Sequence, residues 1–226
     1  MSSKKGGEIN AKLIILLSLF TVLILFTAGA VYGYKNSGSD KSQSEKAQLE
    51  KLLIRENAYI AGSKNAKVTV VEFFDPACPA CVAKAPAVAR LPELYNSQVR
   101  VVYRALAFHN GSDLILSLME AAKEQGKYKE AAAAFNAYYR NWFVNNQVNA
   151  FAAWGVMEKS GADIEGAKNF LDENQAKIDD MLRLNREDAA ALGVDATPTF
   201  FVNGKKVEQN QLIKEIEDEL LKEVKE

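Results

Sequence analysis

An apolar run that ends in two cysteines constrains the fold of this chain more than any other feature. Residues 66–74 (AKVTVVEFF) are almost continuous in β-branched and aromatic side chains, without the polar alternation of a half-exposed strand. Cys78 and Cys81 follow shortly after and are the only two cysteines among 226 residues. The pattern predicts a buried central strand followed by a helix, which is the context in which a Cys-x-x-Cys pair carries out redox chemistry.

The two cysteines are predicted to form a redox-active dithiol. Cys78 would stand at the amino terminus of a helix, where unpaired N–H groups and the helix dipole favour the thiolate. Cys81 would lie one turn further on, close enough to resolve a mixed disulfide. We therefore expect an exposed Cys78 to attack and a more covered Cys81 to resolve. The alternatives are half of a zinc site shared with a second subunit and a plain structural disulfide.

Glu72 lies inside the predicted strand, six residues before the first cysteine. A covered carboxylate is unfavourable unless it has a partner or a task, and burial should raise its pKa. In thiol exchange such a group can take the proton of the second cysteine and return it. Glu72 is therefore a candidate catalytic residue, and the alternative is a Glu on an exposed strand face.

The sequence after the cysteines predicts an α/β domain that is interrupted by helices. We expect a helix over 78–91, a second strand over 98–108 and an all-helical insertion at about 113–185, which is rich in alanine. Four glycines are candidate breaks between the helices of this insertion: Gly126, Gly155, Gly161 and Gly166.

The last part of the chain returns to β structure. Asn203-Gly204 is a strong signal for a two-residue turn, and it predicts a hairpin between 199–202 and 205–207. Residues 209–225 follow as an amphipathic helix, with Leu212, Ile213 and Ile216 among the apolar residues on one face.

The amino-terminal segment predicts a membrane anchor. Residues 13–34 carry no charge, and as a helix they would span about 33 Å, against a hydrocarbon thickness of ~30 Å. We expect residues 1–12 to form a cytoplasmic tail, residues 35–57 a polar linker with a short helix, and residues 58–226 the domain. A cleavable signal peptide is the alternative, because Ala28-Gly29-Ala30 has the small-x-small form of a cleavage site.

Composition and charge argue against several classes of function. Lys and Arg number 28 and Asp and Glu 29, so the net charge of -1 gives no support to nucleic-acid binding. One histidine, His109, and two cysteines cannot complete a four-ligand zinc site in one chain without carboxylates. We expect no metal and no cofactor besides the cysteine pair, and we assign His109 a structural role.

Two motifs carry a resemblance to a known family. The first is Val70-Val71-Glu72-Phe73-Phe74-Asp75 leading into Cys78-Pro79-Ala80-Cys81, and the second is Thr197-Pro198-Thr199-Phe200-Phe201-Val202-Asn203-Gly204. With them, residues 59–225 resemble the DsbA-like thiol–disulfide oxidoreductases of the thioredoxin superfamily, which act in the bacterial envelope. Glu72 and Pro86 match the family's carboxylate and proline around the cysteines, and the helical insertion is the DsbA-like feature.

The resemblance implies a thioredoxin-like mixed sheet and a substrate site. Pro198 should be a cis proline against the cysteine pair, and Thr197 should offer backbone hydrogen bonds to an extended substrate. The implied substrates are proteins with cysteines, and a redox partner in the membrane would recycle the dithiol. The implied location is the bacterial inner membrane, with the catalytic domain facing the periplasm or another extracytoplasmic space.

One residue departs from the family pattern and leaves the direction of electron flow open. Strongly oxidising DsbA-type enzymes usually carry a histidine before the second cysteine, whereas this chain has Ala80. The threonine before the proline, Thr197, also resembles the residue found in isomerases and reductases more than that of the strong oxidases. The alternatives to an oxidase are therefore a reductase or isomerase and, from another class, a chaperone or metal-binding module on the same scaffold.

Overall fold

The computed structural model describes residue 20 and residues 43–222, and a compact unit begins at Leu49. Apart from Phe20, the predicted anchor at 13–34 lies outside the described residues, as does the predicted tail before it. Among the described residues, no helix combines the length and the apolar character needed to cross a bilayer.

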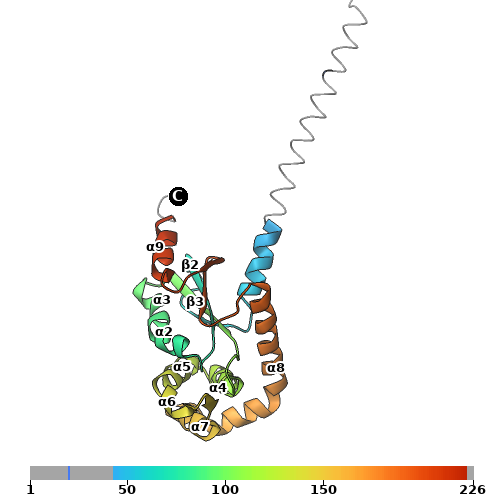
Figure 1. Ribbon diagram of the computed structural model, residues 1–226, viewed down its shortest axis with the longest axis vertical. Helices are drawn as coiled ribbons and strands as arrows, with labels where there is room; N and C mark the ends of the chain where they lie inside the picture. The colour runs from blue at the N-terminus through green and yellow to red at the C-terminus, as the bar shows by residue number, and fades with distance from the viewer. Residues whose placement is uncertain (1–19, 21–42, 223–226) are drawn as a thin grey trace, which may run out of the picture. The chain divides into compact units, whose positions relative to one another are not determined.

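A five-stranded mixed sheet forms the centre of the unit that begins at Leu49 (Figure 1), with the strand order β1-β3-β2-β6-β7. The strands are β1 (Tyr59–Ala61), β2 (Val68–Phe74), β3 (Val99–Ala105), β6 (Thr199–Val202) and β7 (Lys205–Val207). β2 is parallel to β3 and antiparallel to β6, which confirms the prediction of a buried central strand. The predictions missed β1, because three residues are too few to show a strand's periodicity.

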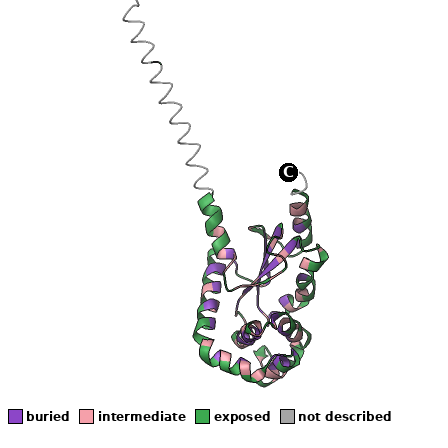
Figure 2. Cartoon of the chain, turned by 180° about the vertical axis from the view of Figure 1, so that it is seen from behind, coloured by how far each residue is buried: buried purple, intermediate pink, exposed green. Residues whose placement is uncertain are grey.

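Helices cover both faces of the sheet (Figure 1). On one face, Val68 and Val70 of β2 pack with α2 (Pro79–Ala89), α3 (Leu91–Leu94) and α9 (Leu212–Lys222). On the other face, Val71 and Phe73 pack with α8 (Ile164–Ala191) and with Leu53 of the helical residues that precede the sheet. The strand's period of two explains this division, and Figure 2 shows the centre of the sheet as buried.

The insertion between β3 and β6 is mostly helical but not entirely so, which corrects the prediction. Its elements are α4 (Ser112–Glu124), α5 (Tyr128–Ala137), α6 (Tyr139–Trp142), β4 (Phe143–Val144), β5 (Gln147–Val148), α7 (Ala150–Lys159) and α8. The short β4–β5 hairpin turns at Asn145 and Asn146, whose φ angles are 52° and 59°. Asparagine enters this left-handed region more readily than other side chains, so Asn-Asn suits the turn.

The predicted ends of the helices in the insertion are half correct. Gly126 and Gly161 follow α4 and α7 with positive φ angles of 69° and 76°. Gly155 instead lies inside α7 and Gly166 in the first turn of α8. α8 also continues to Ala191, six residues beyond the predicted end of the insertion.

The carboxyl-terminal hairpin forms as predicted. Asn203 and Gly204 have φ angles of 45° and 89°, which fit the turn type that the Asn-Gly pair predicts. On α9, Leu212 and Ile216 are buried, whereas Ile213 is 46% exposed. Ile213 was predicted on the buried face and lies mainly toward solvent.

A buried ion network joins β3 to α8. The guanidinium group of Arg104, which is fully buried, donates to Asp188 at 2.6 Å, to Asn185 and to the carbonyl oxygen of Leu52. Arg55 adds two hydrogen bonds of 2.7 Å to the same carboxylate. Burial alone would raise the pKa of Asp188, but the hydrogen bonds and positive charges of the two arginines outweigh it and hold this pKa below its ordinary value.

Candidate active site

Cys78 is positioned by the start of α2. It is the N-cap residue of the helix, and Pro79 follows in the first helical turn, where a missing N–H leaves no hydrogen bond unmade. Both cysteines are free thiols. The predicted exposure of Cys78 is wrong: its exposed fraction is 7%, against 3% for Cys81, although the order of the two is as expected.

The Thr197–Pro198 segment lies directly against Cys78. The Thr197–Pro198 peptide bond is cis, which confirms the prediction. The Sγ atom of Cys78 donates a hydrogen bond of 3.2 Å to the carbonyl oxygen of Thr197. The fold therefore brings together a thiol and a proline segment that are 119 residues apart.

Glu72 is buried in the middle of the sheet, beneath α2. On β2 it lies between Tyr103 of β3 and Phe200 of β6, and its exposed fraction is 2%. Burial raises the pKa of Glu72 to about 8, although the positive charge of Lys84 works in the opposite direction. The carboxyl group can therefore exchange a proton near neutral pH, as the sequence predicted for a covered strand.

Cys81 is a thiol that resists ionisation. Burial raises its pKa well above the ordinary value, and the negative charges of Cys78 and Glu72 add to this effect. The two cysteines thus differ: Cys78 lies at the helix amino terminus, and Cys81 needs a proton acceptor before it can react. Glu72 is a buried carboxyl group whose charge influences the pKa of Cys81.

Asp75 is a buried residue of the site that the sequence predictions missed. The segment 75–78, called the catalytic loop below, begins at this residue, whose side chain is fully buried. One carboxylate oxygen accepts hydrogen bonds from the backbone N–H of Ala77 and the hydroxyl of Ser112. The other accepts from the backbone N–H groups of Phe108 and His109 and contacts the His109 ring at 2.9 Å. The Asp-Pro pair, which favours a turn, was the available signal.

Two side chains of the helical insertion donate hydrogen bonds to the backbone on either side of the cysteine pair. The hydroxyl of Tyr139 donates to the carbonyl oxygen of Ala77 at 3.0 Å, and the amide of Asn136 donates to that of Val82 at 2.7 Å. Both donors belong to the insertion, while the two acceptors lie on either side of the cysteine pair. The insertion therefore helps to set the geometry of the dithiol.

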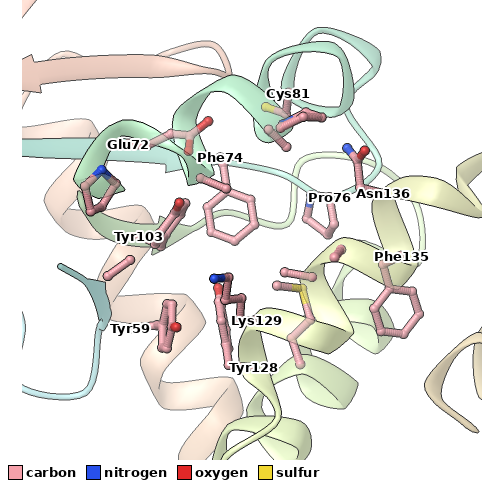
Figure 3. Close-up of a pocket in the computed structure, with 18 of the residues that line it drawn as sticks. Tyr59, Glu72, Phe74, Pro76, Cys81, Tyr103, Tyr128, Lys129, Phe135 and Asn136 are labelled. Carbon is pink, nitrogen blue, oxygen red and sulfur yellow. The ribbon is translucent and has the colours of Figure 1, made fainter. Parts of the chain in front are cut away.

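A cavity of about 520 Å³, called the lateral cavity below, opens beside the dithiol. Glu72 and Cys81 line it at one end, and Tyr59 and Tyr128 lie at the other end (Figure 3). Its other lining includes side chains of α2 and α5 and is mostly apolar. The sequence pattern did not predict this cavity, because its lining comes from separate elements. Its three tyrosines, for example, belong to β1 (Tyr59), β3 (Tyr103) and α5 (Tyr128).

Candidate metal ligands are sparse near the dithiol. Within the described part of the chain, no three or more His, Cys, Asp or Glu side chains gather in a way that could hold a metal ion. The arrangement combines two thiols with a buried carboxyl group, which are groups that can exchange disulfides and transfer protons.

Comparison with known proteins assigns the chain to a family. The family model described as Thioredoxin matches residues 55–222. The chain belongs to the thioredoxin family. One solved structure similar to this thioredoxin-family protein is a thioredoxin-like oxidoreductase from Silicibacter pomeroyi DSS-3, with 26% identity and a TM-score of 0.61. The match covers 78% of this chain and 98% of the other.

A second solved structure shares the fold. It is the thiol-disulfide exchange protein α-DsbA2 from Wolbachia pipientis, with 18% identity and a TM-score of 0.66, covering 80% of this chain and 97% of the other. The family match confirms the prediction that the chain belongs to the thioredoxin superfamily, and both solved structures share its fold.

A curated relative contains a matching segment within a longer protein. The Na(+)/H(+) antiporter NhaA 3 of Salinispora tropica is 31% identical over 153 residues. The match covers 66% of this thioredoxin-family chain but only 22% of the antiporter. The chain therefore spans about a fifth of the length of this relative. The activity in the relative's name, Na(+)/H(+) antiport, is said of that protein and not of this chain.

Proposed function

We propose that this protein is a membrane-tethered thiol–disulfide oxidoreductase that exchanges disulfides with protein substrates outside the cytoplasm. Cys78 exchanges with the substrate, Cys81 resolves, and Glu72 moves the proton of Cys81. The Thr197–Pro198 segment docks the substrate chain, and a redox partner in the membrane resets the pair. The observation that carries the proposal is the hydrogen bond between Cys78 and the Thr197 carbonyl, with the buried Glu72 beneath the same helix.

In the reducing direction the reaction begins at Cys78. Its thiolate attacks one sulfur of a substrate disulfide, so an enzyme–substrate disulfide forms and one substrate thiolate leaves. Glu72 in its ionised form accepts the proton of Cys81, whose thiolate then attacks the sulfur of Cys78. The products are a reduced substrate and a Cys78–Cys81 disulfide, which the membrane partner reduces with two electrons. In the oxidising direction the same steps run in reverse.

The Cys81→Ala variant tests this chemistry. With no resolving thiol, the Cys78–substrate disulfide should accumulate with extracytoplasmic proteins and disappear on reduction. The matched control is Cys78→Ala, which retains Cys81 but lacks the attacking thiol, and it should trap no substrate. Absence of trapped species in Cys81→Ala, together with absence of turnover by the wild-type protein, would reject the proposal.

The direction of electron flow follows from the reduction potential. Ala80 lies exposed in the first turn of α2, where it offers no charge to stabilise the Cys78 thiolate, so a reductase or isomerase is the second candidate. A reduction potential of about -120 mV, measured against glutathione, supports an oxidase, and one of about -270 mV supports a reductase.

The proposed location rests on chemistry and on the apolar segment at 13–34. Disulfide exchange of this kind belongs to oxidising compartments, and the segment has the length of a membrane span. Extraction of bacterial membranes at alkaline pH should leave the full chain in the membrane. Protease added to spheroplasts should then digest the domain; release of the chain by alkali would contradict the tether.

A further inference from the structure

The lateral cavity lies on a different side of the dithiol from the proposed substrate site. Its lining includes Cys81 but, among the described residues, not Cys78, Thr197 or Pro198. Its volume of about 520 Å³ falls within the roughly 300–1,000 Å³ typical of small-molecule sites. A molecule in this cavity would therefore contact the resolving thiol without occupying the substrate-docking segment.

The lining is aromatic and carries no net charge at its rim. The rings of Tyr59 and Tyr128 are stacked with centroids 3.8 Å apart, and the ring of Tyr103 lies next to them. Two charged side chains of opposite sign, Lys129 and Glu93, are exposed among the lining residues. Such a lining favours a flat, neutral molecule, because ring faces pack against one another and the rim favours neither sign of charge.

Glu72 supplies the polar contact at the inner end of the cavity (Figure 3). Its side chain is 2% exposed and lines the cavity together with Cys81. Because its pKa is about 8, the carboxyl group is mostly protonated at neutral pH and can donate to an acceptor oxygen.

From these contacts we propose that the lateral cavity is a binding site for a small, neutral, ring-containing molecule whose carbonyl or hydroxyl oxygen accepts a hydrogen bond from Glu72. The rings of Tyr59, Tyr103 and Tyr128 hold its apolar body. The ligand lies behind Cys81, on the side away from the substrate.

Occupancy of this site has a consequence that rests on the proposed function. A bound molecule engages Glu72, the group that accepts the proton of Cys81 in the proposed reaction. Formation of the Cys78–substrate disulfide should then be unaffected, whereas resolution by Cys81 should slow. The site would regulate the second chemical step without competing with the substrate.

Binding can be measured without turnover by using Prodan, a neutral naphthyl ketone that fluoresces at shorter wavelength in apolar sites. We expect saturable binding with a blue shift, and weaker binding of the anionic probe anilinonaphthalenesulfonate. Ala133→Phe places a ring in the cavity from α5 and should weaken Prodan binding by about tenfold or more. Ala137→Phe, one turn further along the same helix face and outside the lining, is the matched control and should bind normally.

A second blocking variant guards against misfolding of the first. Ala85→Leu fills the cavity from α2, on the other side, and should weaken binding in the same way. Prodan binding that survives both blocking variants, or that falls equally in Ala137→Phe, would overturn the proposal. Because this assay needs no thiol exchange, its failure would leave the trapping result with Cys81→Ala untouched, and the reverse also holds.

Discussion

The hydroxyl group of Ser112 donates a hydrogen bond of 2.7 Å to the buried carboxylate of Asp75, and this contact ties the first residue of α4 to the catalytic loop. The same carboxylate also binds the backbone of Ala77, the residue before Cys78. The start of the insertion and the position of Cys78 are thus linked through one side chain.

Removing the Asp75 carboxylate should destabilise the protein strongly. Asp75→Ala leaves several buried N–H and O–H groups without an acceptor, and we expect a loss of roughly 3–5 kcal/mol in the free energy of unfolding. Ser112→Ala removes one donor and should lose about 1–2 kcal/mol. Ser117→Ala, a buried serine on the same helix, is the control. Urea denaturation measures all three, and additive losses in the Asp75/Ser112 double variant would contradict the linkage.

The free energy of unfolding should depend on pH through Glu72. Its pKa is raised from 4.5 to about 8 in the folded protein, so between these values the folded state binds more protons than the unfolded state. Stability from this group is therefore present at acid pH and is lost as pH rises toward about 8. Glu72→Gln removes the loss, so its stability advantage should grow from near zero at about pH 4 to several kcal/mol above about pH 8. A pH-independent difference in urea denaturation would contradict this.

Placing a histidine at position 80 should make the disulfide more oxidising. Ala80→His brings a group that can carry positive charge near the Cys78 thiolate, and it therefore stabilises the reduced form. We expect the reduction potential to rise by at least about 30 mV, which corresponds to ~1.4 kcal/mol. Ala80→Gln controls for side-chain size, and an equal rise in both variants would rule out a charge effect.

The ion network around Arg104 predicts an asymmetry between its partners. Asp188→Ala leaves the fully buried guanidinium group without its carboxylate, and this should lower the free energy of unfolding by about 3–5 kcal/mol. Arg55→Ala removes a partly exposed partner and should lower it by only about 1 kcal/mol. Thermal and urea denaturation compare the two, and losses of similar size would contradict this division.

The parts of the fold that sequence predicted are those with strong local signals. The continuous apolar run of β2, the Asn203-Gly204 turn and the long amphipathic helices each contain their own evidence, and each is present in the structure. The misses have little local signal. β1 has three residues, and the β4–β5 hairpin has two on each side. Gly155 is accommodated within α7 because helix packing outweighs its weak propensity.

The candidate site was predictable in identity but not in arrangement. Residue type and spacing single out Cys78, Cys81 and Glu72 as candidates. The family motif does the same for Pro198. The roles of Asp75 and of the tyrosines in the lateral cavity depend on contacts between separate elements. The low exposure of Cys78 has the same origin, because the Thr197 carbonyl that contacts it lies far along the chain.

That separation also sets an order of events during synthesis. Both cysteines leave the ribosome well before Thr197 and before β6, the strand that pairs with the second edge of β2. Until then the nascent chain has its dithiol but neither the carbonyl beside Cys78 nor the strand that pairs with β2 at Glu72. Assembly of the site waits for long-range contacts, which form late in folding. The newly made chain would thus carry two reactive thiols before the contacts around them have formed. An oxidant that meets the chain in this interval would react with thiols that the folded site does not yet surround.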